Sequence, residues 1–194
     1  MRTFNLFVVH LENTTSDTIT TNGGLQIYID TRFNEFENRV TEGPVVAVPF
    51  KYDTGVEVGD TLYFHHLVVI NDGQPLTGED NHYVVRYDPD ITINNQAIAY
   101  KSAKTGDIHP MAGWALLEGV EEEEEQLSDT IEVIRLQEKP VTKGAVAFKA
   151  PWVDELGLEV GDVVGFRKNM DYRIKIDGKE YYRTRAADLM YKEI

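Results

Sequence analysis

The sequence predicts an all-β protein that consists of two tandem copies of one small domain. Two short segments recur at a nearly constant spacing, many short apolar runs are separated by turn residues, and no stretch has the pattern of an amphipathic helix of three turns. Regularly spaced short strands are typical of small β-barrels and sandwiches. We therefore expect one domain at 1–105 and a second at 106–194.

The duplication is carried by two pairs of matching segments. Gly55–Asp60 and Gly157–Asp162 have five of their six residues in common and lie 102 residues apart. Val40–Val48 is similar to Val141–Phe148, which begins 101 residues later. Two matches in the same order, with an offset that changes by one residue, indicate a tandem repeat.

Apolar and aromatic residues concentrate in short runs that we expect to be strands. These runs are Leu6–Leu11, Val45–Phe50, Thr61–Ile70, Tyr83–Tyr87, Trp114–Leu117, Ala145–Phe148, Val163–Phe166 and Tyr172–Ile176.

Turn chemistry accompanies these strands. Asp177-Gly178 predicts a type I′ hairpin turn, because both central residues of that turn have positive φ. In each Val-Gly-Asp, the glycine is expected in a conformation closed to other residues and the aspartate is expected to accept hydrogen bonds from the turn backbone. Asp60 and Asp162 are therefore predicted to be structural and not catalytic.

The composition excludes several classes of function. The formal net charge is −14, with −7 up to Thr105 and −7 after it, so neither half offers the basic patch that a nucleic-acid-binding protein needs. No apolar run approaches the ~20 residues of a membrane span, and Met1–Phe4 leads directly into an expected strand, which predicts no signal peptide. Cysteine is absent, which excludes disulfides and cysteine-type zinc sites and fits a cytoplasmic protein.

The sequence offers little support for a catalytic site or a metal site. His65 and His66 are adjacent on an expected strand, so their side chains are predicted to face opposite ways. Asp88-Pro89-Asp90 is interpreted as a turn and Glu121–Glu125 as a solvated loop. Three further histidines have no partner at ligand spacing, namely His10, His82 and His109. We expect no enzyme, no metal and no cofactor.

The order of the motifs resembles the chaperonin-10 (GroES) family. Asn22–Ile27 and the following Glu42–Val48 are similar to that family's Gly-Gly-aliphatic-x-aliphatic loop and its next strand. The other similar segments are the Val-Gly-Asp turns at 58–60 and 160–162, the opening Ile108–Met111, and the closing Asp90-Ile91 and Asp188–Met190.

The resemblance implies two tandem GroES-like small β-barrels, with a mobile loop in the first. It implies a homo-oligomeric, ring-shaped lid that binds a GroEL-type, ATP-driven chaperonin and closes its folding chamber. The implied binding residues are Gly23, Gly24, Leu25, Gln26 and Ile27, with Leu25 and Ile27 as hydrophobic anchors.

The second copy lacks the Gly-Gly motif. Its corresponding stretch contains Ile131, Val133 and Ile134, which are either a degenerate binding loop or a plain strand. In the resembled family, neighbouring domains join through their first and last strands. We therefore expect an internal joint near Ile91–Ile108 and a joint between chains that pairs Leu6–Leu11 with Leu189–Ile194.

Two alternatives stay open. Leu25, Ile27 and Ile29 alternate with polar residues, which is also the pattern of a half-buried strand after a Gly-Gly turn. A duplicated GroES-like fold could equally serve a structural or adaptor protein, for example a viral accessory protein, because a fold does not fix a function.

Overall fold

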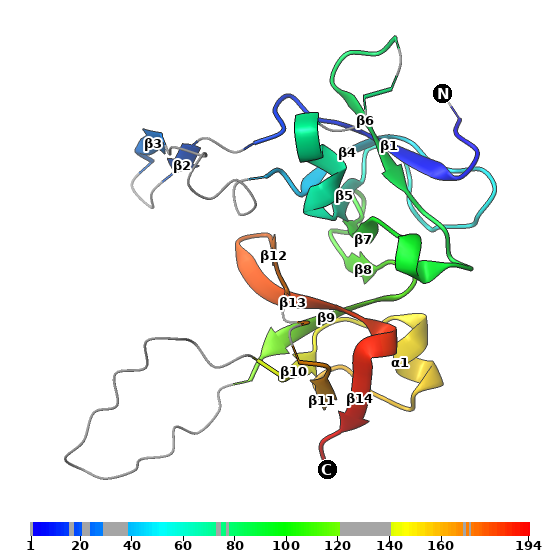
Figure 1. The fold of residues 1–194 in the computed structure, drawn as a ribbon, viewed down its shortest axis with the longest axis vertical. Coiled ribbons are helices and arrows are strands. Elements are labelled where there is room, and N and C mark those ends of the chain that lie inside the picture. Colours follow the sequence, from blue (N-terminus) through cyan, green and yellow to red (C-terminus); the bar gives the residue numbers. More distant parts are fainter. Residues whose placement is uncertain are drawn as a thin grey trace. The chain divides into compact units, whose positions relative to one another are not determined.

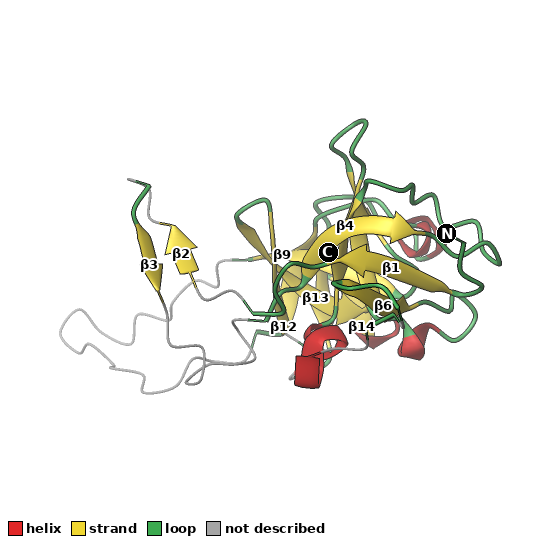
Figure 2. Ribbon diagram, turned by 90° about the horizontal axis from the view of Figure 1, so that it is seen from above, coloured by secondary structure: helices red, strands yellow, loops and turns green. Residues whose placement is uncertain are grey.

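A computed structural model of the 194-residue chain is mostly β and divides into two compact units, Met1–Gly113 and Trp114–Ile194. Figure 1 follows the chain, and Figure 2 shows that strands dominate and that the helices are short. The structure describes residues 2–15, 18–20, 24–28, 39–72, 75–76, 78–120, 141–168, 170 and 172–194.

The first unit contains a six-stranded antiparallel sheet with the order β6-β1-β4-β5-β7-β8. Its central side chains are fully buried, for example Phe7 on β1 and Leu62 on β5. The bounds are β1 (Leu6–His10), β4 (Glu42–Ala47), β5 (Thr61–Phe64), β6 (His82–Arg86), β7 (Ala97–Lys101) and β8 (Ile108–Pro110).

The second unit contains a six-stranded antiparallel sheet with the order β12-β13-β9-β10-β11-β14. One core cluster includes Leu117, Val153 and Phe166. The bounds are β9 (Trp114–Gly119), β10 (Lys143–Val146), β11 (Val163–Phe166), β12 (Tyr172–Ile176), β13 (Lys179–Arg185) and β14 (Leu189–Lys192).

The remaining described elements are short. A separate two-stranded sheet pairs β2 (Thr18–Thr20) with β3 (Gln26–Tyr28). The helices are α1 (Pro151–Glu155) and the 3-10 helices η1 (His66–Asp72), η2 (Thr92–Asn94) and η3 (Ala186–Asp188).

The two units repeat one strand arrangement. The order β6-β1-β4-β5-β7 in the first corresponds to β13-β9-β10-β11-β14 in the second. A register shift lies between Tyr63 and Phe64 on β5, and another lies at the corresponding place on β11, between Gly165 and Phe166. Phe64 N donates to Thr41 O and Phe166 N donates to Thr142 O, both at 2.8 Å. The duplication read from the sequence therefore extends to strand pairing.

The two Val-Gly-Asp turns share the glycine conformation and the aspartate hydrogen bond that the sequence predicts. Gly59 and Gly161 have φ of 98° and 96°, a region that favours glycine. The carboxylate of Asp60 accepts a hydrogen bond from Glu57 N, and that of Asp162 accepts one from Glu159 N, both at 2.8 Å. These contacts confirm the structural role of both aspartates.

Asp162 also links its turn to the closing strand. Its Oδ2 accepts a hydrogen bond from Lys192 Nζ at 2.6 Å, and this bond, together with that from Glu159 N, holds the pKa of the carboxyl below its ordinary value of 3.8. A lowered pKa stabilises the folded state above the unfolded pKa, and the contribution is lost as pH falls through the folded pKa. We expect Asp162→Asn to lower the melting temperature at pH 5–7 and to differ less from the native protein below pH ~4. Thermal unfolding across this range checks it, and a difference that grows on acidification would contradict it.

In one cross-strand pair, the large residue lies on one strand in the first repeat and on the opposite strand in the second. In the first unit, Tyr63 on β5 faces Ala99 on β7. In the second, Gly165 on β11 faces Tyr191 on β14, and the tyrosine ring occupies the space where a Cβ on Gly165 would lie. The aromatic residue of this cross-strand pair thus lies on opposite strands in the two repeats; Tyr63 is buried, whereas Tyr191 is 50% exposed.

Two expectations about strands are wrong. The expected strand Thr61–Ile70 ends at Phe64, and the chain continues into η1, which buries Val68 and Val69. A short apolar run suits a buried helix as well as a strand, so periodicity could not separate them. Asp90-Ile91 is not the closing segment of the first repeat: β7, which pairs with β5 as β14 pairs with β11, holds that place.

The predicted hairpin at Asp177-Gly178 is confirmed. These two residues connect β12 and β13 with φ of 51° and 80°. Positive φ at both positions is what a type I′ turn requires.

Candidate functional site

The candidate site lies on the β2–β3 hairpin, in the segment between β1 and β4. Thr15 and Arg39 form an antiparallel bridge at the base of this segment, and Val40 N donates to Thr14 O at 3.0 Å. In the hairpin, the backbone at Ile19 pairs with that at Ile27. Gly24 precedes β3 with φ of 81°, which explains a glycine at this position.

Residues Gly24–Tyr28 are all exposed, including neighbours on β3 whose side chains point to opposite faces of the strand. Leu25 is 65% exposed and Ile27 48%, although both are large and aliphatic. A half-buried strand would alternate between buried and exposed side chains, and this segment does not. The segment therefore presents aliphatic surface that its own chain leaves accessible.

Sequence reasoning missed Tyr28, which is 79% exposed and follows Ile27 directly. On a strand, neighbouring side chains point to opposite faces, so Tyr28 lies on the face opposite Ile27. The only signal in the sequence was an aromatic residue next to the aliphatic motif. The hairpin thus carries apolar groups on two faces.

Several predicted site residues lie outside the described residues. They are Gly23 in the first repeat and Ile131, Val133 and Ile134 in the second.

What this hairpin can contribute is binding energy, because aliphatic side chains perform no covalent chemistry. Transferring a Leu or Ile side chain from water into an apolar groove is worth roughly 1.5–3 kcal/mol. Recognition of an extended segment by pockets for its side chains is a common mode of peptide binding.

The histidines are arranged differently from the expectation. His65 follows β5 and His66 begins η1, and their rings lie side by side with centroids 4.3 Å apart, because the chain leaves the sheet at this point. His10 and His82 meet across β1 and β6 with ring centroids 5.3 Å apart. Within the described part of the chain, no group of three or more His, Cys, Asp or Glu residues is placed to hold a metal ion.

The Asp88-Pro89-Asp90 segment is a turn, as predicted. Asp88 Oδ1 accepts hydrogen bonds from Asp90 N and Ile91 N, both at 3.0 Å. This carboxylate is therefore engaged in local backbone contacts.

None of the helices in the described ranges has the length and apolar character required to cross a bilayer. Comparison with known protein families and with curated proteins finds no match to this chain.

Proposed function

We propose that this protein is a co-chaperonin: a lid that binds a GroEL-type chaperonin through the β2–β3 hairpin and closes its folding chamber. The observation that carries the proposal is the exposure of Leu25 and Ile27 on a hairpin between two paired strands of a duplicated β-domain. The order of motifs that resembles the chaperonin-10 family supports the same assignment, with each unit as a GroES-like barrel.

Weak individual contacts suit such a lid. A segment that orders on binding gives up part of its interaction energy, so one hairpin binds weakly. A ring presents several hairpins at once, and avidity restores affinity while it leaves release possible.

A pull-down with a bacterial-type chaperonin tests the proposal. In the presence of ATP, the full-length protein should co-purify with the chaperonin, and electron microscopy should show density at the end of the chaperonin cylinder. Absence of a complex with several such chaperonins would favour the structural or adaptor role.

The ring is part of the proposal, and its expected joint needs one correction. β1 (Leu6–His10) pairs with β4 on one edge and β6 on the other, so it has no edge left for the closing strand of a neighbouring chain. Inside the chain, the closing strand β7 instead pairs with β8, which precedes β9. The corresponding partner for β14 is the segment that precedes β1 in a neighbouring chain.

The outer edge of β14 is open in the single chain. Among the described strands, β14 pairs with β11 alone, and Met190 and Tyr191 are 68% and 50% exposed. In the first unit, Met111 N donates to Ile98 O across the β7–β8 joint at 2.8 Å. Met190 is the residue of β14 that corresponds to Ile98, so its carbonyl oxygen is expected to face the open edge. Unpaired edges readily accept another strand.

We expect Met190→Pro to reduce the ring to smaller species, because the proline ring fixes φ and disturbs the pairing of a further strand at this edge. Met190→Thr is the matched control, since it shortens the side chain but places no ring on the backbone. Sedimentation velocity should show the ring for Met190→Thr and smaller species for Met190→Pro. Equal assembly by both variants would rule out this joint, and circular dichroism verifies that both remain folded.

A further inference from the structure

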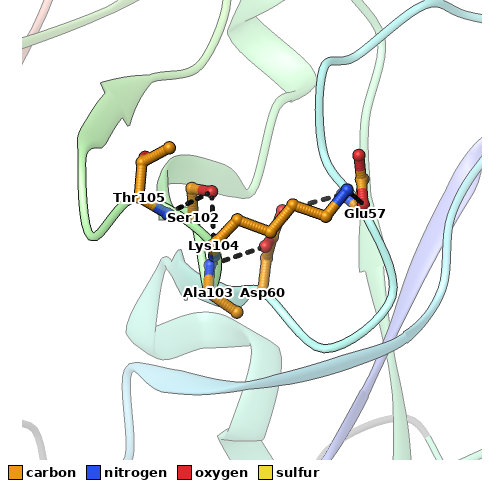
Figure 3. A network of polar contacts seen from close by, with 6 residues as sticks. All are labelled: Glu57, Asp60, Ser102, Ala103, Lys104 and Thr105. Carbon is orange, nitrogen blue, oxygen red and sulfur yellow. Dashed lines mark hydrogen bonds and ion pairs between the residues drawn. The ribbon is translucent and has the colours of Figure 1, made fainter.

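The Val-Gly-Asp turn of the first unit is covered by its own chain (Figure 3). The residues that follow β7 fold over this turn, and Ala103 N donates to Asp60 Oδ1 at 2.8 Å. Lys104 Nζ lies 2.5 Å from Glu57 Oε2. This hydrogen bond raises the pKa of Lys104, as a bound carboxylate does for an ammonium group.

Tyr100, on β7, packs against the same turn. Its hydroxyl oxygen lies 2.8 Å from the place where a Cβ on Gly55 would be. The first turn therefore receives three kinds of contact: an aromatic ring, a backbone N–H and a lysine ammonium group.

In the ranges that the structure describes, the corresponding turn of the second unit lacks the aromatic ring, the backbone N–H on the second carboxylate oxygen and an ammonium group on its glutamate; its lysine contact is that of Lys192 with Asp162 Oδ2 at 2.6 Å. A Cβ on Gly157, the counterpart of Gly55, would meet no atom within 4 Å. Within the described part of the chain, the Glu159 carboxylate has no ion pair, although its counterpart Glu57 has one. Among the described residues, Asp162 accepts hydrogen bonds through Oδ2 alone, whereas Asp60 accepts them through both carboxylate oxygens.

A groove of about 510 Å³ opens beside this turn of the second unit. Its lining includes the buried Val153 and Leu158 and the exposed Val160, while Glu159 supplies negative charge. Lys149 and Asp154 pair with each other at 3.5 Å on its border. The groove thus offers apolar side chains next to the Glu159 carboxylate, which has no ion pair among the described residues.

We propose that this groove and the adjoining turn bind a lysine-bearing peptide segment of another protein. The lysine ammonium group pairs with Glu159, and a backbone N–H of the segment donates to Asp162 Oδ1, as Lys104 and Ala103 do in the first unit. Charge complementarity supports this occupant, and in the first repeat the corresponding turn carboxylates already bind a segment of that chemistry. The Ser102–Thr105 segment of a second copy is engaged in its own chain, so the segment comes from a different protein. The proposal is independent of chaperonin binding.

Zero-length carbodiimide cross-linking of the full chain with a synthetic peptide tests this inference. The peptide spans Tyr100–Asp107 with an acetylated N-terminus and with Lys101 changed to Gln, so that Lys104 provides its only amine. The dissociation constant of this peptide should be on the order of 1 mM, because a free peptide lacks the high effective concentration of a segment that is part of the same chain. Peptide mapping should place the cross-link at Glu159, with a yield several-fold above that of a scrambled peptide.

Two variants sharpen the outcome. Glu159→Gln should abolish the sequence-dependent cross-link, whereas Glu155→Gln, which removes a neighbouring exposed carboxylate, should leave it unchanged. Glu57 of the first unit, already paired with Lys104, should not react with the peptide. Equal yields from the native-order and scrambled peptides, or an unchanged yield in Glu159→Gln, would overturn the proposal.

Discussion

The double substitution Leu25→Asp and Ile27→Asp should abolish chaperonin binding while leaving the melting temperature unchanged. Both side chains are exposed in the free protein, at 65% and 48%, so little apolar contact is lost and no charge is buried. Bound in an apolar groove, each would contribute roughly 1.5–3 kcal/mol. The loss repeats in every hairpin of a ring, so avidity cannot conceal it.

Co-sedimentation with a chaperonin measures the binding, and thermal unfolding measures the melting temperature. Ile93→Asp is the matched control, because it places a charge at an aliphatic residue that is 77% exposed outside the hairpin, and it should retain binding. A double variant that melts much earlier would mean that the segment packs as a core strand, since buried unpaired charges are strongly destabilising. A stable double variant that still binds would exclude these two residues as anchors.

Asp60→Ala should destabilise the first unit by about 3 kcal/mol. Asp60 is 3% exposed, and its two carboxylate oxygens accept hydrogen bonds from Glu57 N and Ala103 N. Hydrogen bonds to a charged group contribute about 1.5–3 kcal/mol each, and their loss leaves two backbone donors unpaired. For a domain of this size, that corresponds to a fall in melting temperature on the order of 10 °C or more.

Asp162→Ala is the internal control for this change. Its side chain is 22% exposed and its second partner is the ammonium group of Lys192, which water can replace. Differential scanning calorimetry should therefore show a larger shift for Asp60→Ala than for Asp162→Ala. Equal shifts would mean that the coverage of the first turn by Ser102–Thr105 adds no stability.

The features that local chemistry dictates could be predicted from the sequence. Val-Gly-Asp requires positive φ at its glycine, and Asp177-Gly178 requires it at both residues, so each turn could be placed to the residue. The duplication followed from two matching segments, because repeated sequence folds into repeated pairing.

Features that depend on tertiary pairing could not be predicted in this way. The run from Thr61 to Ile70 is apolar apart from Thr61 and the two histidines, and only packing decides that it bends into η1 after Phe64. β7 was not recognised as the closing strand, because its five residues, Ala97–Lys101, carry no motif and the Asp-Ile pair precedes it. The meeting of His10 and His82 arises from the register of β1 with β6.

For the candidate site, the sequence supplied the motif but not its exposure. Alternating Leu25 and Ile27 are equally compatible with a half-buried strand and with an exposed hairpin. That β2 and β3 pair only with each other among the described strands decides between these arrangements. The smaller number of contacts at the turn of the second unit could not be predicted from the sequence either, because it emerges only from comparing corresponding positions of the two repeats.

Hydrogen–deuterium exchange of the hairpin, with and without a chaperonin and ATP, tests the central claim most directly. Amides of Leu25–Tyr28 should exchange rapidly in the free protein and become strongly protected in the complex, whereas those of the buried β7 should exchange slowly in both states. Protection confined to the hairpin is the result that a lid bound through Leu25 and Ile27 predicts. A chaperonin complex that leaves exchange at Leu25–Tyr28 unchanged would contradict it.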